Sequence, residues 1–245
     1  MKPQPAYTLT DPATGTDYLV FLEVPPVSEP GPHPAVLFLD GDDQFRFAVD
    51  AYRAARAAGE VAPLVLVGLG YGASYMKPGN WRVRDYTPAA LPTEAESGGA
   101  EGFRRFLTHT FWPDLARRVP VRNDVRGIAG HSLGSLFVLH ALWQEKPFFT
   151  HHLASAPSLW WADRAILCDA QNLQRKGVAL PAKLYLSVGE EDSTSMTGDL
   201  ALLEDQLAAL PFPQLAVTSQ RFPGKNHFDV LPDAFGAGLR ALFPG

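Results

Sequence analysis

The chain is poor in cysteines, in long apolar runs and in clusters of positive charge, which are the features that form disulfides, cross membranes and bind nucleic acids. Its one cysteine, Cys168, cannot form an internal disulfide, and we expect it to pack as a small apolar side chain. No run of Lys and Arg stands out, and the formal net charge is −5. Neither an apolar leader nor a run of membrane-spanning length is visible. These features predict a cytoplasmic protein without nucleic-acid or membrane partners.

Nothing in the sequence divides the chain into parts. The 245 residues contain no internal repeat or low-complexity tract, and 46% of them are hydrophobic. This length and composition are typical of one α/β domain with a substantial core. We therefore expect a single domain over 1–245, whose oligomeric state the sequence leaves open.

Short apolar runs alternate with stretches of helical pattern. Runs of this kind predict strands that are buried on both faces, and the alternation predicts a mostly parallel, doubly wound sheet. The β-rich run at 18–24 is followed by Pro25 and Pro26, which end it. This run predicts an antiparallel strand at the edge of the sheet. The other expected strands are 35–39, 64–69, 151–155, 183–188 and 215–222, and the expected helices are 44–58, 101–119, 200–210 and 234–242.

The residues at 71–100 interrupt this alternation. They are rich in Gly, Pro, Asn and Ser and show no clear period, although a loop of this length is uncommon in a compact domain unless it is functional. Their aromatic content argues against disorder. We expect them to form a lid or a pocket wall carrying Tyr71, Tyr75, Trp81, Arg82, Arg84 and Tyr86.

The most informative motif is Gly130-His131-Ser132-Leu133-Gly134, which lies between an apolar run and a helix-forming stretch. Gly-x-Ser-x-Gly in a strand–turn–helix context is typical of a nucleophile elbow, in which the serine occupies a sharp turn at the end of a strand. The two glycines would keep side chains away from closely approaching backbone. Ser132 is therefore the candidate nucleophile.

A nucleophilic serine needs a base and a group that orients the base. His227 follows the last predicted strand after a Pro-Gly turn, and three acids follow the strand at 183–188. The order serine, acid, histidine is the order expected after an elbow. We choose Asp192 as the acid, with Glu190 and Glu191 as open alternatives.

An oxyanion would need two backbone N–H donors. Leu133 supplies one, and the loop after the strand at 35–39 supplies the other, through Asp42 or alternatively Asp43. We expect the acidic side chains of this loop to turn away from the oxyanion or to cap the next helix. The loop does not fit an EF-hand, and a phosphatase with Asp40 as its nucleophile would leave the elbow unexplained.

The motif and several later segments resemble the esterase family of the α/β-hydrolases, and most closely its enterobactin (siderophore) esterase-like branch. The resemblance runs from about residue 40 to the end. It is carried by the elbow and by 82–88, 98–103, 155–161, 189–192 and 226–227. It implies the α/β-hydrolase fold and ester hydrolysis by Ser132 and His227, with Asp192 at the acid position. It implies neither a metal nor a cofactor.

The sequence defines the substrate less closely than it defines the ester-hydrolysis reaction. We expect a small or siderophore-like ester, with Trp160, Trp161, Tyr86 and Arg82 lining the pocket. A ferric siderophore with three negative charges would need a basic cleft, for which Arg82 and Arg84 are the obvious candidates. Acyl transfer by the same residues and a non-catalytic binding protein with this fold are the alternatives to hydrolysis.

Overall fold

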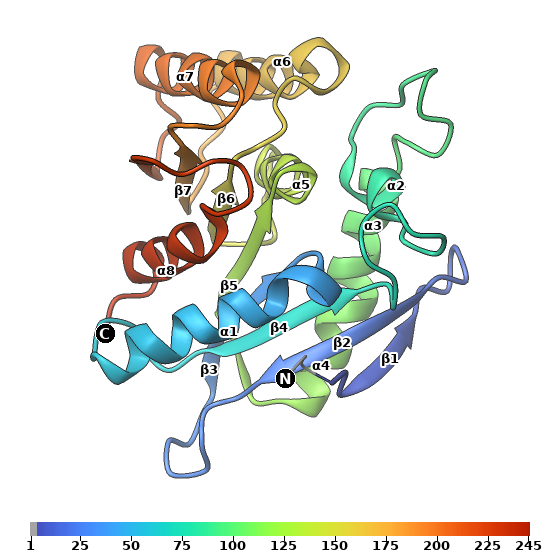
Figure 1. The fold of residues 1–245 in the computed structure, drawn as a ribbon, viewed down its shortest axis with the longest axis vertical. Coiled ribbons are helices and arrows are strands. Elements are labelled where there is room, and N and C mark those ends of the chain that lie inside the picture. Colours follow the sequence, from blue (N-terminus) through green and yellow to red (C-terminus); the bar gives the residue numbers. More distant parts are fainter. Residues whose placement is uncertain (1–3) are drawn as a thin grey trace.

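A computed structural model describes residues 4–245, which are built on one eight-stranded sheet (Figure 1). Across the sheet the strand order is β1-β2-β4-β3-β5-β6-β7-β8. The strands from β4 to β8 in this order pair in parallel, whereas β1 and β2 are antiparallel. Their bounds are β1 Tyr7–Thr10, β2 Asp17–Glu23, β3 His33–Phe38, β4 Val65–Gly70, β5 Val121–His131, β6 His151–Ser155, β7 Ala182–Gly189 and β8 Leu215–Phe222.

Helices cover both faces of the sheet, as the doubly wound prediction requires. On one face α1 and α8 pack against each other and against the central strands, and on the other face α5 packs on β5 and β6 (Figure 1). The bounds are α1 Gly41–Ala57, α2 Arg82–Tyr86, α3 Ala100–Phe106, η1 Leu107–Phe111, α4 Trp112–Arg118, α5 Leu133–Leu142, α6 Trp161–Arg175, α7 Thr194–Ala209 and α8 Leu231–Leu242.

Apolar spacing explains why α1 forms where it does. Phe45, Ala48, Val49 and Tyr52 recur at intervals of three and four residues and are buried against the sheet. The helix begins at Gly41, directly after β3, so its first turn lies at the carboxyl edge of the sheet. The elbow helix α5 begins at the same edge, and a Cβ on Gly134 would lie 3.4 Å from the Asp40 carboxylate. The beginnings of two helices therefore meet beside Ser132.

Two expectations about local structure need correction, and the elements β1 and α6 are additional to those expected. The strand at 18–24 is not the edge of the sheet, because β1 pairs outside it, and four residues with two threonines gave too weak a pattern to predict β1. The helix α6 was not predicted as an element. Cys168 is exposed on α6 rather than packed, because Ile166 and Ala170 occupy the buried side of that helix.

The segment 71–100 is ordered by side-chain contacts rather than by long elements. Its one helix, α2, is five residues long, and Asp85 and Tyr86 on it are buried. The Tyr18 hydroxyl donates to Asp85 at 2.6 Å, and the Trp161 indole N–H donates to the Ala89 carbonyl at 2.8 Å. These bonds attach the segment to β2 and to the beginning of α6. Within residues 4–245 no helix is long and apolar enough to cross a membrane.

Candidate active site

Ser132 lies on the turn between β5 and α5, in a backbone conformation that few residues adopt. Its φ is 60° and its ψ is −122°, which is a strained combination for a residue with a side chain. The turn is tight enough that a Cβ on Gly130 would lie 2.5 Å from the carbonyl carbon of Gly134. The first glycine of the motif is therefore required by backbone contact, and the serine side chain stands at the end of the strand.

His227 and Asp192 come together from two different loops. His227 Nδ1 lies 2.7 Å from Asp192 Oδ2, and the Asp192 side chain is 3% exposed. Glu190 and Glu191 are exposed at the surface. Of the three acids proposed from the sequence, Asp192 is the one that contacts the imidazole in this structure.

Backbone packing holds these two loops against each other. The Glu191 N–H donates to the Lys225 carbonyl at 2.9 Å, and the Glu190 N–H donates to the Phe222 carbonyl at 3.0 Å. A Cβ on Gly189 would overlap the Lys225 carbonyl, so the approach of the loops requires glycine at this position. The geometry of the Asp192–His227 contact thus follows from the parallel pairing of β7 with β8.

Ser132 and His227 line one cavity, although they do not form a hydrogen bond with each other among the contacts of the described residues. The Ser132 hydroxyl lies 3.4 Å from the Ser158 hydroxyl, which is long for such a bond. Catalytic hydrogen bonds are often loose before substrate binds. The cavity has a volume of about 380 Å³ and is lined by Asp43, Gln44, Phe47, Tyr75, Met76, Arg82, His131, Ser132, His227, Phe228 and Leu231.

His131 packs behind the imidazole of His227. The two ring centroids are 4.6 Å apart, and His131 Nδ1 is 3.1 Å from the Ser155 hydroxyl on β6. Burial, and to a smaller extent the neighbouring His227, lower the pKa of His131 to about 3. His131 is therefore a neutral wall of the cavity at physiological pH.

The family model described as "Putative esterase" matches residues 12–214. The chain belongs to this esterase family.

Two curated relatives belong to its siderophore-esterase branch. The chain is 31% identical to ferri-bacillibactin esterase BesA of Bacillus subtilis, over 93% of this chain and 85% of that protein. It is also 31% identical to the apo-salmochelin esterase of Escherichia coli, over 95% of this chain and 77% of that protein.

Solved structures show the same fold. The BES protein from Bacillus cereus superposes with a TM-score of 0.88 at 24% identity, over 99% of this chain and 95% of that one. Siderophore hydrolase EstB from Aspergillus nidulans gives 0.85 at 22% identity, over 99% and 95% of the two chains. The α/β fold with an antiparallel edge is therefore that of this esterase branch.

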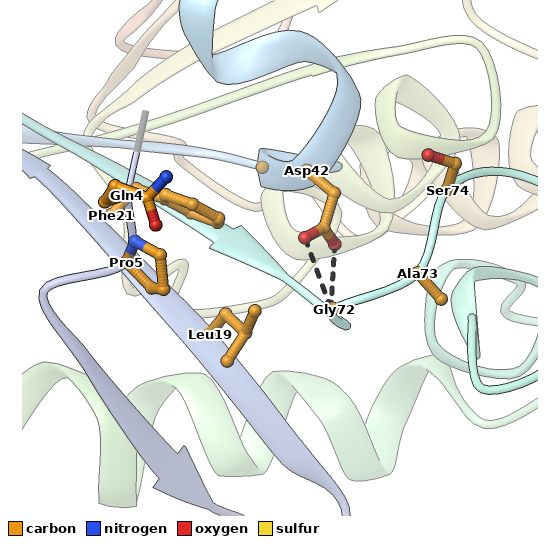
Figure 2. A pocket seen from close by; sticks show the side chains of 9 residues that line it. Gln4, Pro5, Leu19, Phe21, Asp42, Gly72, Ala73 and Ser74 are labelled. Atoms are coloured by element: carbon orange, nitrogen blue, oxygen red, sulfur yellow. Dashed lines mark hydrogen bonds between the residues drawn. The ribbon is translucent and has the colours of Figure 1, made fainter. Parts of the chain in front are cut away.

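Of the two acidic residues considered as oxyanion donors, only Asp42 turns its side chain away from the cavity as expected, because Asp43 lines the cavity and neither caps α1. The Asp42 carboxylate accepts hydrogen bonds from the Tyr71 N–H and from the Gly72 N–H, the second of which Figure 2 shows. It lines a separate pocket beside Leu19 and Phe21, whereas Asp43 lines the cavity of the esterase. The Asp43 and Ser135 N–H groups already donate to the carbonyls of Asp40 and Ser132, whereas the Asp42 and Leu133 N–H groups have no acceptor among the contacts of the described residues. Asp42 and Leu133 therefore remain candidate donors.

Arg82 is the predicted substrate-binding residue that does line the cavity. Its guanidinium donates two hydrogen bonds to the Asp40 carboxylate, at 2.9 and 3.0 Å, and Asp40 is completely buried. Burial raises the pKa of Asp40, and the Arg82 charge opposes this rise. Arg82 also lies over the Tyr75 and Tyr86 rings, at 4.8 and 5.6 Å.

The three predicted aromatic pocket residues lie elsewhere. Tyr86 is 1% exposed, and its hydroxyl accepts the Asp40 N–H at 3.1 Å. Trp161 is buried in the core, while Trp160 is exposed, and neither is among the described residues that line the cavity. Tyr86 and Trp161 are core residues, and the Tyr86 hydroxyl and the Trp161 indole N–H each have a backbone hydrogen-bond partner there.

Sequence reasoning missed several residues of the site. Ser158 follows β6 and is buried near Ser132, within the segment 155–161 that carries part of the family resemblance. Met76 and Phe228 are large apolar residues that the structure leaves exposed at the cavity. Phe228 could have been found from its position directly after His227, whereas no sequence pattern marks Met76.

Proposed function

We propose that this esterase is a serine carboxylic-ester hydrolase that works through an acyl-enzyme. The observation that carries the proposal is the joint placement of Ser132 and His227 on one cavity, with the Asp192 carboxylate hydrogen-bonded to Nδ1 of the imidazole. Three loops that are distant in sequence supply these groups. The arrangement supports nucleophilic catalysis without a cofactor.

Each residue would then have one task. Asp192 accepts the Nδ1–H of His227, which leaves Nε2 as the base, and Nε2 takes the Ser132 proton as the hydroxyl oxygen attacks the ester carbonyl. The Leu133 and Asp42 N–H groups hold the oxyanion of the tetrahedral intermediate. His227 returns the proton to the leaving alcohol, and water then cleaves the acyl-enzyme by the same steps in reverse.

The substrate that we propose is a siderophore-like ester. Two relatives that match along nearly all of this chain are described as siderophore esterases. The cavity of about 380 Å³ opens to exposed Met76 and Phe228 and can accept part of a larger ester. Apolar walls with a few polar groups are typical of small-molecule sites.

The test is the Ser132→Ala variant, assayed with 4-nitrophenyl acetate and with a trilactone siderophore. We expect turnover to fall by at least about 10³-fold, because removing the nucleophile leaves only the residual effect of the oxyanion donors and binding. The melting temperature is expected to stay within a few degrees. Unchanged turnover would refute the proposal.

Two further assays separate the alternatives. A fluorophosphonate probe should label Ser132 in the unaltered chain, and failure to label would favour a non-catalytic binding protein. Acyl transfer to an added alcohol in preference to water would assign the same residues to an acyltransferase.

A further inference from the structure

We propose that Ser158 is a second catalytic hydroxyl, which donates a hydrogen bond to the Ser132 oxygen while that oxygen carries negative charge. This inference rests on the proposed hydrolysis at Ser132. It comes from the surroundings of the Ser158 hydroxyl, which lies against the nucleophile and outside the cavity. Such a donor acts in both halves of the reaction, because the Ser132 oxygen attacks in the first half and leaves in the second.

The Ser158 hydroxyl is buried against the nucleophile. Its Oγ lies 3.4 Å from Ser132 Oγ, Ser158 is 1% exposed, and no other hydrogen bond to this hydroxyl occurs within residues 4–245. A buried hydroxyl without a partner is unfavourable, so the contact with Ser132 orients it. Ser158 is not among the described residues that line the cavity. It therefore reaches the Ser132 oxygen from the protein interior rather than from the substrate side.

Backbone hydrogen bonds fix Ser158 in this place. The Ser158 N–H donates to the Ser132 carbonyl at 3.3 Å, so the two serines are joined through the main chain as well. Just before it, the Ala156 N–H donates to the Ser187 carbonyl on β7 at 2.7 Å. Just after it, the Leu159 side chain is completely buried in the core. The hydroxyl is thus held on a rigid turn beside the nucleophile.

Strained backbone lies on both sides of this turn. Ala156 has a φ of 44°, and the three consecutive residues at 162–164 have φ values of 48°, 52° and 65°. None of them is glycine, and left-handed conformations are unfavourable for residues with a side chain. Strain of this kind persists where the surrounding structure imposes it, and it is concentrated at active sites. The strain is consistent with a turn that is held in place for the contact between Ser158 and Ser132.

The chemistry balances without a further reactant. His227 Nε2 takes the Ser132 proton as the Ser132 oxygen bonds to the ester carbon, and it passes that proton to the departing alcohol. In the second half, His227 takes a proton from the attacking water and returns it to the Ser132 oxygen, which keeps the electron pair of the breaking C–O bond. Ser158 keeps its own proton throughout and acts only as a donor.

The length of the resting contact agrees with this role. A hydrogen bond to a charged oxygen is shorter and stronger than one between two neutral hydroxyls. Catalytic hydrogen bonds are often long before substrate binds and tighten in the transition state. We therefore expect the contact between Ser158 and Ser132 to shorten as charge develops on Ser132, which stabilises the transition state more than the bound substrate.

The test compares Ser158→Ala and Ser158→Cys with the unaltered chain. We measure kcat and kcat/KM for 4-nitrophenyl acetate and the second-order rate constant of fluorophosphonate labelling. Ser158→Ala should lower all three by about 10–100-fold, which is what a hydrogen bond to a charged group is worth. Cysteine fills the space of serine but is a weak donor, so Ser158→Cys should recover only part of each rate.

Three results would overturn the role of Ser158. They are unchanged or faster rates in Ser158→Ala, an unchanged labelling rate in that variant, and full recovery in Ser158→Cys, which would mean that Ser158 only fills space.

Ser187→Ala is the matched control. Ser187 is also a fully buried serine, its carbonyl supports the same turn, and its hydroxyl has no partner among the described residues. Alanine keeps that carbonyl, so we expect Ser187→Ala to leave all three rates near their original values. Equal losses in Ser187→Ala and Ser158→Ala would show a general disturbance of the turn and would overturn the inference. An unaltered chain that neither cleaves the ester nor reacts with the probe would instead refute the proposed hydrolysis.

Discussion

The buried pair of Asp40 and Arg82 gives the sharpest prediction about stability, tested by Arg82→Met. Methionine keeps much of the length of the side chain but leaves the Asp40 carboxylate, which is 0% exposed, without its bidentate partner. The strongest remaining side-chain contact to that carboxylate is the Gln44 amide at 3.4 Å. Removing one partner of a buried pair costs about 3–5 kcal/mol of unfolding free energy.

A surface pair in the same protein provides the control. Arg53 also makes a bidentate pair, with Glu23, but its side chain is 63% exposed. Arg53→Met should cost about 0.2–1 kcal/mol, because water screens an exposed pair. For a chain of this size, the Arg82→Met cost corresponds to a fall in Tm of about 6–20 °C, at roughly 2–4 °C per kcal/mol.

The assay is equilibrium urea unfolding at several pH values. Burial already raises the pKa of Asp40, and losing Arg82 removes the main opposing influence. Because the folded variant then binds a proton more tightly than the unfolded chain, its stability relative to the unaltered protein should improve as pH falls from 7 towards 4. Asp40→Asn combined with Arg82→Met should recover much of the loss, since asparagine tolerates the positive φ of 53° at this position. A cost for Arg82→Met no larger than that of Arg53→Met, or no recovery in the double variant, would refute the reasoning.

Two further predictions concern the imidazole groups. Asp192→Asn should lower kcat by about 10⁴-fold, because the amide favours the wrong tautomer of His227. The control Glu191→Gln should leave kcat near its original value. Equal effects of the two variants in the ester assay would show that Asp192 does not orient the imidazole. His152 is fully buried with both ring nitrogens unpartnered among the described residues, and burial lowers its pKa from 6.5 to about 3. The unfolded chain therefore binds more protons between these pH values, so stability falls as pH falls through this window, by up to about 1.4 kcal/mol per pH unit. His152→Leu should make the acid limb of a urea-stability profile shallower by this amount, and an unchanged slope would show that His152 does not titrate on unfolding.

Much of the fold could be predicted because its signals are local. Fully apolar runs such as 35–39 and 64–69 mark strands buried on both faces, and the structure has β3 and β4 there. The family and its fold could be predicted from short motifs, such as the nucleophile elbow, in which each residue type is required by the local backbone geometry or by the chemistry. The four residues of β1 carried no such signal, because a short edge strand has half its neighbours missing and little apolar pattern.

The sequence by itself determined the α/β architecture, the esterase family and the strand-end positions of Ser132, Asp192 and His227. Only the tertiary structure decided which acid contacts the imidazole, that Arg82 pairs with Asp40 and Arg84 with Asp85, and that Tyr86 and Trp161 belong to the core. The physical reason is that secondary structure depends mainly on residues that are neighbours in the sequence. The partner of a charged or aromatic side chain depends instead on segments that are distant in the sequence and come together on folding. Asp40 and Arg82 are 42 residues apart in sequence, and nothing short of the folded chain shows that they neutralise each other.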